Sequence, residues 1–275
     1  MRINTNVASL NAQEAANLTN SRMQSALEKL SSGLRINKAS DDASGLAIAD
    51  KLRTQATSIN QGIDNGNSAI ALLQIADKSM AEQSNILDSV KAKLIQANTA
   101  TTSTAGRNAI AADIAKLMTQ FENIAKSTNY NGTDLISTNA TDLDFQVGES
   151  SSNNKITLSA VKSQLANYTG ISSLNSLSAI TAASAGTLEG LVDTAINDLN
   201  KKRGSIGSVQ NQVDSAVRNL MTQATNVKAA ESIIRDVDYA KESANFNKQN
   251  IIAQAGAYAI SQANAAQQNV LRLLQ

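Results

Sequence analysis

Few residues of this sequence have the type and spacing that chemistry would need. The chain contains no His and no Cys, so the commonest general base, the commonest zinc ligand and the thiol nucleophile are all missing. The adjacent carboxylates of Asp41 and Asp42 could act as a general acid and base, but no catalytic motif surrounds them. Ser40 precedes them, and a Ser followed by acids is typical of a helix start, where the hydroxyl caps the helix and the acids face its positive end. We therefore interpret Ser40-Asp41-Asp42 as a helix start.

The remaining binding and modification motifs are weak. The glycines are scattered singly, so no Gly-rich phosphate loop is present, and Gly204 and Gly207 lie within an apolar pattern typical of a packed helix. Asn-x-Thr sequons are expected by chance in a chain rich in Asn and Thr; they begin at Asn17, Asn131, Asn139 and Asn167. An enzyme built from Asp, Glu, Ser, Lys and Tyr alone is an alternative without positive support. The sequence predicts a protein that is not an enzyme and has no cofactor or metal site.

The composition indicates that the elements positioning these residues are mainly helices. Aromatic residues make up 3% of the chain and hydrophobic residues 42%, so the apolar content is mainly Ala, Leu, Ile and Val, which suit close packing between helices. Proline is absent, although average usage would give roughly a dozen in a chain of this length. Because proline interrupts helices, its absence predicts long unbroken ones, with compositional drift as the alternative.

Charge and hydropathy argue against two classes of partner. The net charge of +1 is too balanced to indicate nucleic acid, and the only tight basic cluster, Lys201-Lys202-Arg203, is interpreted as a solvated helix surface. The N-terminal residues lack the apolar run of a signal peptide, and no stretch is long enough to span a membrane, so membrane insertion is not expected. Taken alone, these features favour a soluble cytoplasmic protein.

Apolar residues recur at spacings of three and four in four blocks, a pattern typical of helices that pack along a stripe. The blocks cover residues 3–34, 52–94, 110–124 and 188–273. A helix as long as the second block cannot bury its apolar stripe alone, so the pattern predicts a mainly α fold. We expect a long antiparallel helical bundle or coiled coil formed by the N- and C-terminal segments.

One segment changes to the period of a strand. Residues 142–147 and 155–158 alternate polar and apolar types around a turn-rich loop, which predicts a small β-hairpin at residues 142–158. The Asn131-Gly132 pair can supply positive φ angles for a turn after the third block. Residues 159–186 are rich in Ser, Thr, Asn and Ala with weak periodicity, so we expect a short surface loop there.

The two ends of the chain carry longer motifs. The N-terminal part reads MRINTNVASLNAQ, LSSGLRINKASDDASGLAIADKLRTQ and NGNSAIALLQIADKSMAE, and KSTNYNGTDLI follows the third block. The C-terminal part reads AESIIRDVDYAKESANFNKQNIIAQAGAYAISQANAAQQNVLRLLQ. In identity and order these segments resemble the bacterial flagellin family.

The resemblance implies a structural subunit that polymerises into the extracellular helical flagellar filament used for motility. A hook–filament junction protein or another axial flagellar protein is the main alternative, and an unrelated coiled-coil adhesin or secretion-tip protein is a third. Family members leave the cell uncleaved through the flagellar type III export channel, which accounts for the missing signal peptide. The resemblance also implies an export chaperone and cap or junction proteins as partners.

The family's layered architecture maps onto this chain. Residues 1–38 with 236–275 would form an inner terminal coiled-coil layer, and residues 39–235 an outer helical layer. The segment at 159–186 is too short for the variable outer domains of many flagellins, so a minimal, two-layer form is expected. The terminal residues expected to drive self-assembly are Ile3, Val7, Leu10, Leu27, Leu30, Leu34, Ile252, Leu271, Leu273 and Leu274.

Three features limit what the resemblance transfers. Gln267 stands where the family commonly has proline, so the last turns are expected to be more regular. Residues 87–96 (LDSVKAKLIQ) lack the arginine and glutamate arrangement that engages the vertebrate flagellin receptor in many flagellins, which makes recognition by that receptor doubtful. Candidate O-glycosylation sites, in the manner of some family members, are Ser150, Ser151, Ser172 and Ser173.

Overall fold

The computed structural model describes residues 5–149 and 154–273, with side chains described up to residue 269. Its internal contacts divide the chain into two units. The terminal unit joins the N-terminal residues up to 56 with the C-terminal residues from 225, and the central unit comprises residues 57–224. Long helices dominate both units, which confirms the predicted mainly α fold.

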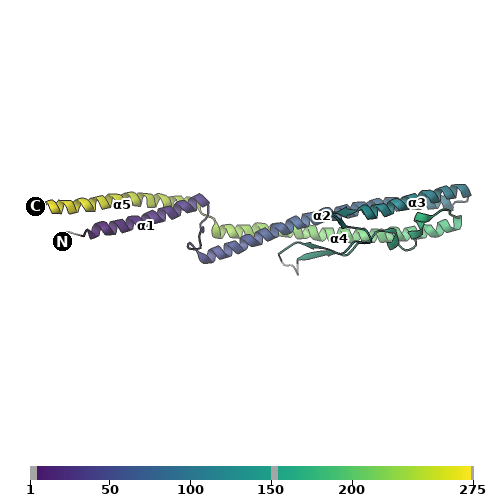
Figure 1. The fold of residues 1–275 in the computed structure, drawn as a ribbon, viewed down its shortest axis with the longest axis horizontal. Coiled ribbons are helices and arrows are strands. Elements are labelled where there is room, and N and C mark those ends of the chain that lie inside the picture. The colour runs from purple at the N-terminus through teal and green to yellow at the C-terminus, as the bar shows by residue number, and fades with distance from the viewer. Residues whose placement is uncertain (1–4, 150–153, 274–275) are drawn as a thin grey trace. The chain divides into compact units, whose positions relative to one another are not determined.

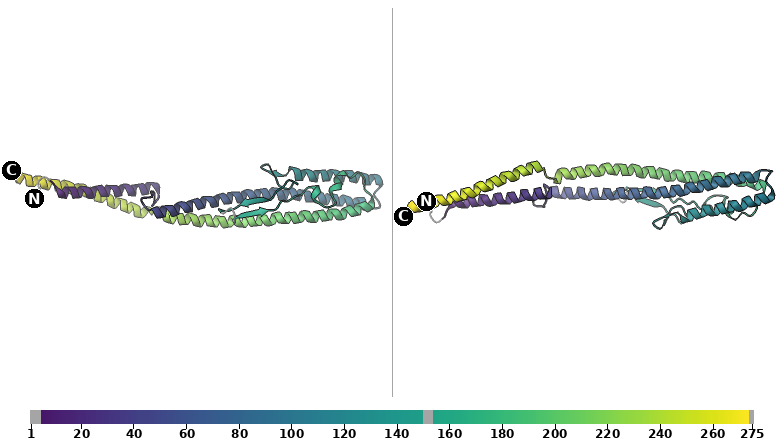
Figure 2. Two further views of the ribbon diagram at one scale, coloured as in Figure 1. Left: turned by 60° about the horizontal axis from the view of Figure 1, so that its bottom comes forward. Right: turned by 90° about the horizontal axis from the view of Figure 1, so that it is seen from above.

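The terminal unit is built around two antiparallel helices, α1 (Val7–Ser32) and α5 (Tyr239–Leu273), which lie side by side in Figures 1 and 2. The Asn6 carboxamide caps α1 by accepting from the Ser9 N–H at 3.1 Å, and it also donates to the Ala263 carbonyl of α5 at 3.1 Å. Gly33 ends α1 with a φ of 73°, a left-handed conformation that glycine adopts without strain. Local capping signals thus set both ends of α1.

Backbone hydrogen bonds tie the end of α1 to the start of α5. The Arg35 N–H donates to the Arg235 carbonyl at 2.6 Å, and the Val237 N–H donates to the Gly33 carbonyl at 3.0 Å. Leu34 and Asp236 form an antiparallel bridge between these hydrogen bonds. These contacts fix the register in which α1 and α5 pack.

The expected helix start at Ser40-Asp41-Asp42 is right in position but wrong in the capping residue. Helix α2 (Ala43–Asn98) begins after Asp42, whose carboxylate accepts from the Gly45 N–H at 2.8 Å. The Asp41 carboxylate instead accepts from the N–H groups of Lys38 and Asn37, and these hydrogen bonds lower its pKa. A Ser in the preceding turn cannot reach the free N–H groups of α2, so the acid nearest the helix caps it.

In the central unit, α2, α3 (Thr104–Ser127) and α4 (Ala182–Arg235) run alongside one another in both views of Figure 2. They enclose one apolar core. Its largest fully buried side chains include Leu73, Met80 and Phe121. Two ion pairs join α2 to α4 at the margin of this core: Lys91 with Asp193 at 2.6 Å, and Arg203 with Asp77 at 2.9 Å.

The predicted turn at Asn131-Gly132 and the predicted pair of strands after it are confirmed. Strands β1 (Asn129–Tyr130) and β2 (Thr133–Asp134) pair around Asn131 and Gly132, whose φ angles are 50° and 78°. Strands β3 (Leu143–Gln146) and β4 (Lys155–Leu158) form the predicted antiparallel hairpin, with Leu143 opposite Leu158. Phe145 and Leu158 turn their side chains into the core.

The expectation of a surface loop at residues 159–186 is wrong. Helix α4 begins at Ala182, and the preceding residues 159–181, here called the strap, contain two short 3-10 helices, η1 (Leu165–Asn167) and η2 (Ser172–Ser176). Six apolar side chains of the strap are buried in the core of the central unit: Val161, Leu165, Tyr168, Ile171, Leu174 and Ile180. Because the 3-10 turns interrupt any regular period, the polar residues between these side chains resemble a solvated loop in the sequence.

A buried polar network fastens the strap to the helices. The Gln83 amide of α2 donates to the Ser163 carbonyl at 3.0 Å and to the Phe121 carbonyl of α3 at 3.1 Å. The Ser163 hydroxyl in turn donates to the Gln83 side-chain oxygen and lies 2.6 Å from the Tyr168 hydroxyl. Burial raises the pKa of Tyr168 to about 12. The network therefore satisfies polar groups that would otherwise be costly to bury.

The interpretation of the basic cluster as a solvated surface holds for only one of its three residues. Lys201 is exposed, whereas Arg203 pairs with Asp77. The Lys202 ammonium lies 4.0 Å from the centre of the Tyr168 ring, and burial lowers its pKa. The cluster thus anchors α4 to the strap and to α2.

Candidate assembly surface

The packing between α1 and α5 follows a heptad pattern of mainly small residues. Less exposed positions recur three or four residues apart along both helices. On α1 they are Ser9, Ala12, Ala16, Thr19, Met23, Ala26 and Leu30; on α5 they are Glu242, Phe246, Gln249, Ala253, Gly256, Ile260, Ala263 and Gln267. Alternating spacings of three and four are those of a coiled coil, in which such positions face the partner helix.

Small side chains bring the two helices close together. A Cβ added at Gly256 would lie 3.9 Å from the Ala16 Cβ, which is ordinary van der Waals contact. Thr19 is buried, and its hydroxyl donates to the Ala15 carbonyl at 2.8 Å, so this polar residue leaves no unsatisfied group at the interface. The α1–α5 coiled coil therefore closes without large aliphatic residues at most of its inward positions.

Most of the terminal residues predicted to drive self-assembly do not line the α1–α5 interface of a single chain. The exposed fractions of Val7, Leu10 and Leu27 are 52%, 54% and 55%, and that of Ile252 is 41%. Leu30 and Leu34 are half-buried. The side chains of the other predicted residues, Ile3, Leu271, Leu273 and Leu274, lie outside the described residues.

The part of these residues in assembly stays a prediction, and their choice from the sequence has a clear origin. Two sets of residues recur at helical spacing in α1: a set rich in Ala and Thr, and a set of larger aliphatic residues offset around the helix. Sequence reasoning followed the larger residues, because they carry more apolar area. The signal that could have found the interface is the Ala12, Ala16, Thr19 and Ala26 series, whose small side chains allow close helix approach.

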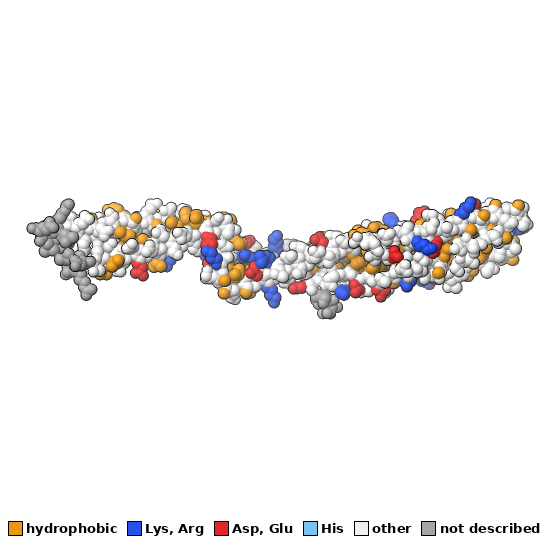
Figure 3. Space-filling view, viewed as in Figure 1, with side chains coloured by type: hydrophobic (Ala, Val, Ile, Leu, Met, Phe, Trp, Pro, Cys, Tyr) orange, Lys and Arg blue, Asp and Glu red, His pale blue; other side chains and the backbone are white. Residues whose placement is uncertain are grey.

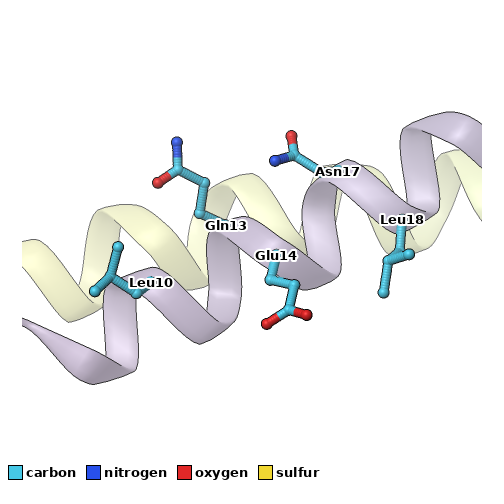
Figure 4. A pocket seen from close by; sticks show the side chains of 5 residues that line it. All are labelled: Leu10, Gln13, Glu14, Asn17 and Leu18. Atoms are coloured by element: carbon cyan, nitrogen blue, oxygen red, sulfur yellow. The ribbon is translucent and has the colours of Figure 1, made fainter.

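The coiled coil consequently carries large apolar side chains on its outside. Leu10 and Leu18 line a shallow depression on α1 with Gln13, Glu14 and Asn17, and Figure 4 shows Glu14 and Leu18 pointing to the same side of the helix. On α5 the exposed fractions of Ile251 and Tyr258 are 67% and 73%. Figure 3 shows hydrophobic side chains with few charged ones over the described part of α1 and α5 that faces the viewer. We call the exposed side of the α1–α5 coiled coil its outer face, which includes Leu10, Glu14, Leu18, Lys248, Ile251, Ile252 and Tyr258.

The outer face has the character of a protein-binding surface. Within the residues that the structure describes, no cluster of three or more carboxylates could hold a metal ion. None of the helices in the described part of the chain combines the length and apolar character that a membrane crossing requires. Exposed apolar side chains repeated along a helix are typical of a protein-binding surface.

Comparison with known proteins identifies the family of the chain. The model of the bacterial flagellin N-terminal helical region matches residues 3–141, and that of the C-terminal helical region matches residues 188–274. The chain is 36% identical to a flagellin of Bacillus subtilis, with all of both chains covered. The chain belongs to the bacterial flagellin family. It is also 34% identical to a flagellin of Halalkalibacterium halodurans and 32% identical to a flagellar filament 33 kDa core protein of Treponema phagedenis, again over all of both chains.

Among solved structures, the fold is similar to the crystal structure of Bacillus cereus flagellin. The TM-score is 0.50 at 28% identity, and the match covers 61% of this chain and 94% of that chain. The flagellin family models cover α1, α2, α3 and α5 and most of α4, and they leave out the strap and the β3–β4 hairpin. The helices with the outer face are therefore flagellin helices, in a family of structural proteins.

The candidate glycosylation sites divide between described and undescribed residues. Ser172 and Ser173 are exposed on η2, whereas Ser150 and Ser151 lie outside the described residues. The neighbouring Leu174 is fully buried, so η2 presents its serines outward from a fixed position. Their modification remains a prediction.

Proposed function

We propose that this flagellin is a structural subunit that polymerises into the extracellular filament of the flagellum. The observation that carries the proposal is the outer face, because the α1–α5 coiled coil closes on small residues and leaves large apolar ones exposed. Burial against neighbouring copies would contribute roughly 25 cal/mol per Å² of apolar surface. The Treponema phagedenis relative is itself named as a flagellar filament core protein.

Assembly of this kind requires contacts that do not close. One surface of each copy meets a different surface of the next, so the polymer grows as an open helix without completing a ring. In the proposed filament, residues 1–38 with 236–275 form the inner coiled-coil layer, and residues 39–235 form the layer around it. Motility then follows from rotation of a stiff polymer, and no side chain performs catalysis.

Export and partner proteins complete the proposal. The family resemblance supports uncleaved passage through the type III export channel, with a chaperone before export and cap or junction proteins at the ends of the filament. No observation favours the alternative role of a hook–filament junction protein. Comparison of the secreted protein's N-terminal residues with the printed sequence tests the uncleaved route.

The experiment for assembly is electron microscopy of purified protein in a salting-out buffer, with and without short filament seeds. Long filaments of constant, narrow width are expected, because only two layers are available. Discrete particles or persistent monomers in the presence of seeds would instead support a junction or tip protein.

Recognition by the vertebrate flagellin receptor is expected to be weak or absent. Within residues 87–96, the side chains of Leu87, Val90 and Leu94 are fully buried. Lys91 faces outward but pairs with Asp193. Lys93 is likewise half-buried and pairs with Asp113. The exposed positions of this segment are Asp88, Ser89, Ala92, Ile95 and Gln96, so it presents neither an arginine nor a glutamate. A receptor reporter assay checks the expectation, and strong signalling would contradict it.

O-linked sugars on η2 are the last part of the proposal. The exposed hydroxyls of Ser172 and Ser173 are open to an enzyme that modifies the folded chain. The intact mass of protein from native filaments is expected to exceed the sequence mass by whole sugar units, with the additions mapping to these residues. A mass equal to that of the sequence excludes the modification.

A further inference from the structure

The outer face contains two isolated charges of opposite sign. Between Arg2 and Arg22, Glu14 is the only charged residue; between Glu242 and Arg272, Lys248 is the only one. Glu14 lies on α1 and Lys248 on α5, and both are exposed. Each therefore stands alone in a long uncharged stretch of its helix.

Each charge is flanked by exposed apolar side chains on the same side of its helix. Leu10 and Leu18 lie four residues before and after Glu14, with exposed fractions of 54% and 55%. Ile251 and Ile252 follow Lys248 by three and four residues, with exposed fractions of 67% and 41%. Residues three and four apart are neighbours on a helix surface, so both helices present a charge embedded in an apolar stripe.

The two charges cannot pair within one chain. Gly256 lies beside Ala16, and Asn6 contacts Ala263, so residues of α1 and α5 whose numbers total about 270 lie level in the antiparallel coiled coil. Lys248 is therefore level with Arg22, and Glu14 lies roughly 12 Å away along the helix axis. In the residues that the structure describes, neither Glu14 nor Lys248 has an ion-pair partner.

Burial of the outer face would make an unpaired charge costly. A charge taken out of water without a partner strongly opposes association, whereas a hydrogen-bonded pair largely offsets that cost. Opposite charges in matching apolar stripes are complementary, and complementarity of this kind fixes the register between two surfaces. A second copy of this chain carries the matching stripe, which makes it the partner that the charges select.

We propose that Glu14 of one copy pairs with Lys248 of a neighbouring copy, and that this pair sets the register in which the outer faces of two coiled coils pack. The inference rests on the proposed function, since it describes one contact within the polymer. The Glu14–Lys248 contact joins different surfaces of the two copies, so it can repeat without closing.

Charge reversal tests the pair in the full-length chain. Glu14→Lys and Lys248→Glu are each expected to raise the critical concentration for seeded assembly by about thirtyfold or more, because each variant places like charges together. The double variant restores opposite charges and is expected to assemble within a few-fold of the unmodified protein. Circular dichroism of the free chains checks that the central unit stays folded in each variant.

A matched control uses the other exposed cation at the same level of the coiled coil. Arg22→Glu combined with Glu14→Lys is expected to stay defective, because Arg22 is not the partner of Glu14. The proposed Glu14–Lys248 pair is overturned if Arg22→Glu restores assembly to Glu14→Lys. Normal assembly of either single charge-reversal variant also overturns it. In those cases the unmodified protein still forms filaments, whereas its failure to assemble would contradict the proposed function itself.

Discussion

In the central unit the largest apolar side chains point inward, whereas in the terminal unit many of them point outward. Leu73, Met80 and Phe121 are completely buried, while Leu18 and Tyr258 are more than half exposed. The two units contain similar helices but distribute their side chains differently. The central unit closes its core within one chain, and the terminal unit keeps apolar surface available for other copies. The central unit should therefore resist unfolding more strongly than the terminal unit.

Removal of a core side chain of the central unit should cause the largest loss of stability. Phe121 is fully buried and packs edge-on against the Tyr168 ring, with 5.8 Å between ring centres. Phe121→Ala is expected to lower the free energy of unfolding by about 3–5 kcal/mol, because a large cavity is left behind. Urea unfolding followed by circular dichroism measures the change. A loss below about 1 kcal/mol would mean that this core is loosely packed.

Two glycines in the central unit should shift stability in opposite directions. A Cβ added at Gly66 of α2 would collide with Val217 of α4, whereas one at Gly204 would meet nothing within 4 Å. Gly66→Ala is expected to cost about 1–3 kcal/mol through overpacking. Gly204→Ala is expected to stabilise α4 by roughly 0.5–1 kcal/mol through helix propensity.

The two glycine variants serve as controls for each other in the same urea assay. Equal effects at Gly66 and Gly204 would show that the helices shift apart easily and that the close approach of α2 and α4 at Gly66 is unimportant.

Alkaline pH should destabilise the central unit through ionisation of Tyr168. Its phenol ionises near pH 10.0 in the unfolded chain, but burial raises the folded-state pKa to about 12. The stability that Tyr168 contributes is thus present below pH 10 and is lost as the pH rises toward 12. Lys202 acts in the opposite direction. Burial lowers its pKa, so its loss of a proton makes the folded state more stable relative to the unfolded state as the pH rises.

Unfolding midpoints between pH 9 and 12 measure this dependence. Tyr168→Phe is expected to flatten the alkaline loss of stability of the central unit. An unchanged pH profile in that variant would assign the alkaline transition to other groups.

The smallest effect on the free chain is expected at the outer face. Leu10→Ala removes a side chain that is already 54% exposed, so the free energy of unfolding should change by no more than about 0.5 kcal/mol. The same variant should weaken seeded assembly, because the proposed polymer buries Leu10 between copies. Parallel measurements of monomer unfolding and critical concentration separate the two effects. A large loss of monomer stability would place Leu10 in the core of a single chain and remove the contrast between the units.

Much of the fold follows from local patterns in the sequence. The long helices, the hairpin at β3–β4 and the positive φ angles of Asn131 and Gly132 were predictable, because each depends on residue period or on turn chemistry within a few positions. The terminal motifs were also sufficient to indicate the flagellin family. These features are encoded by neighbouring residues, so a single sequence reveals them.

Tertiary structure alone decided how those elements use their side chains. The sequence shows two helical repeats in α1, one of small and one of large residues, and only the partner helix determines that the small repeat, with Ala16 opposite Gly256, faces inward. The strap required the same information, because Ser163 bonds to Gln83 and Tyr168 packs against Phe121, and both partners are far away in the sequence. A residue period specifies that a side chain lies on a given face, whereas burial of that face depends on which surfaces are close enough to exclude water.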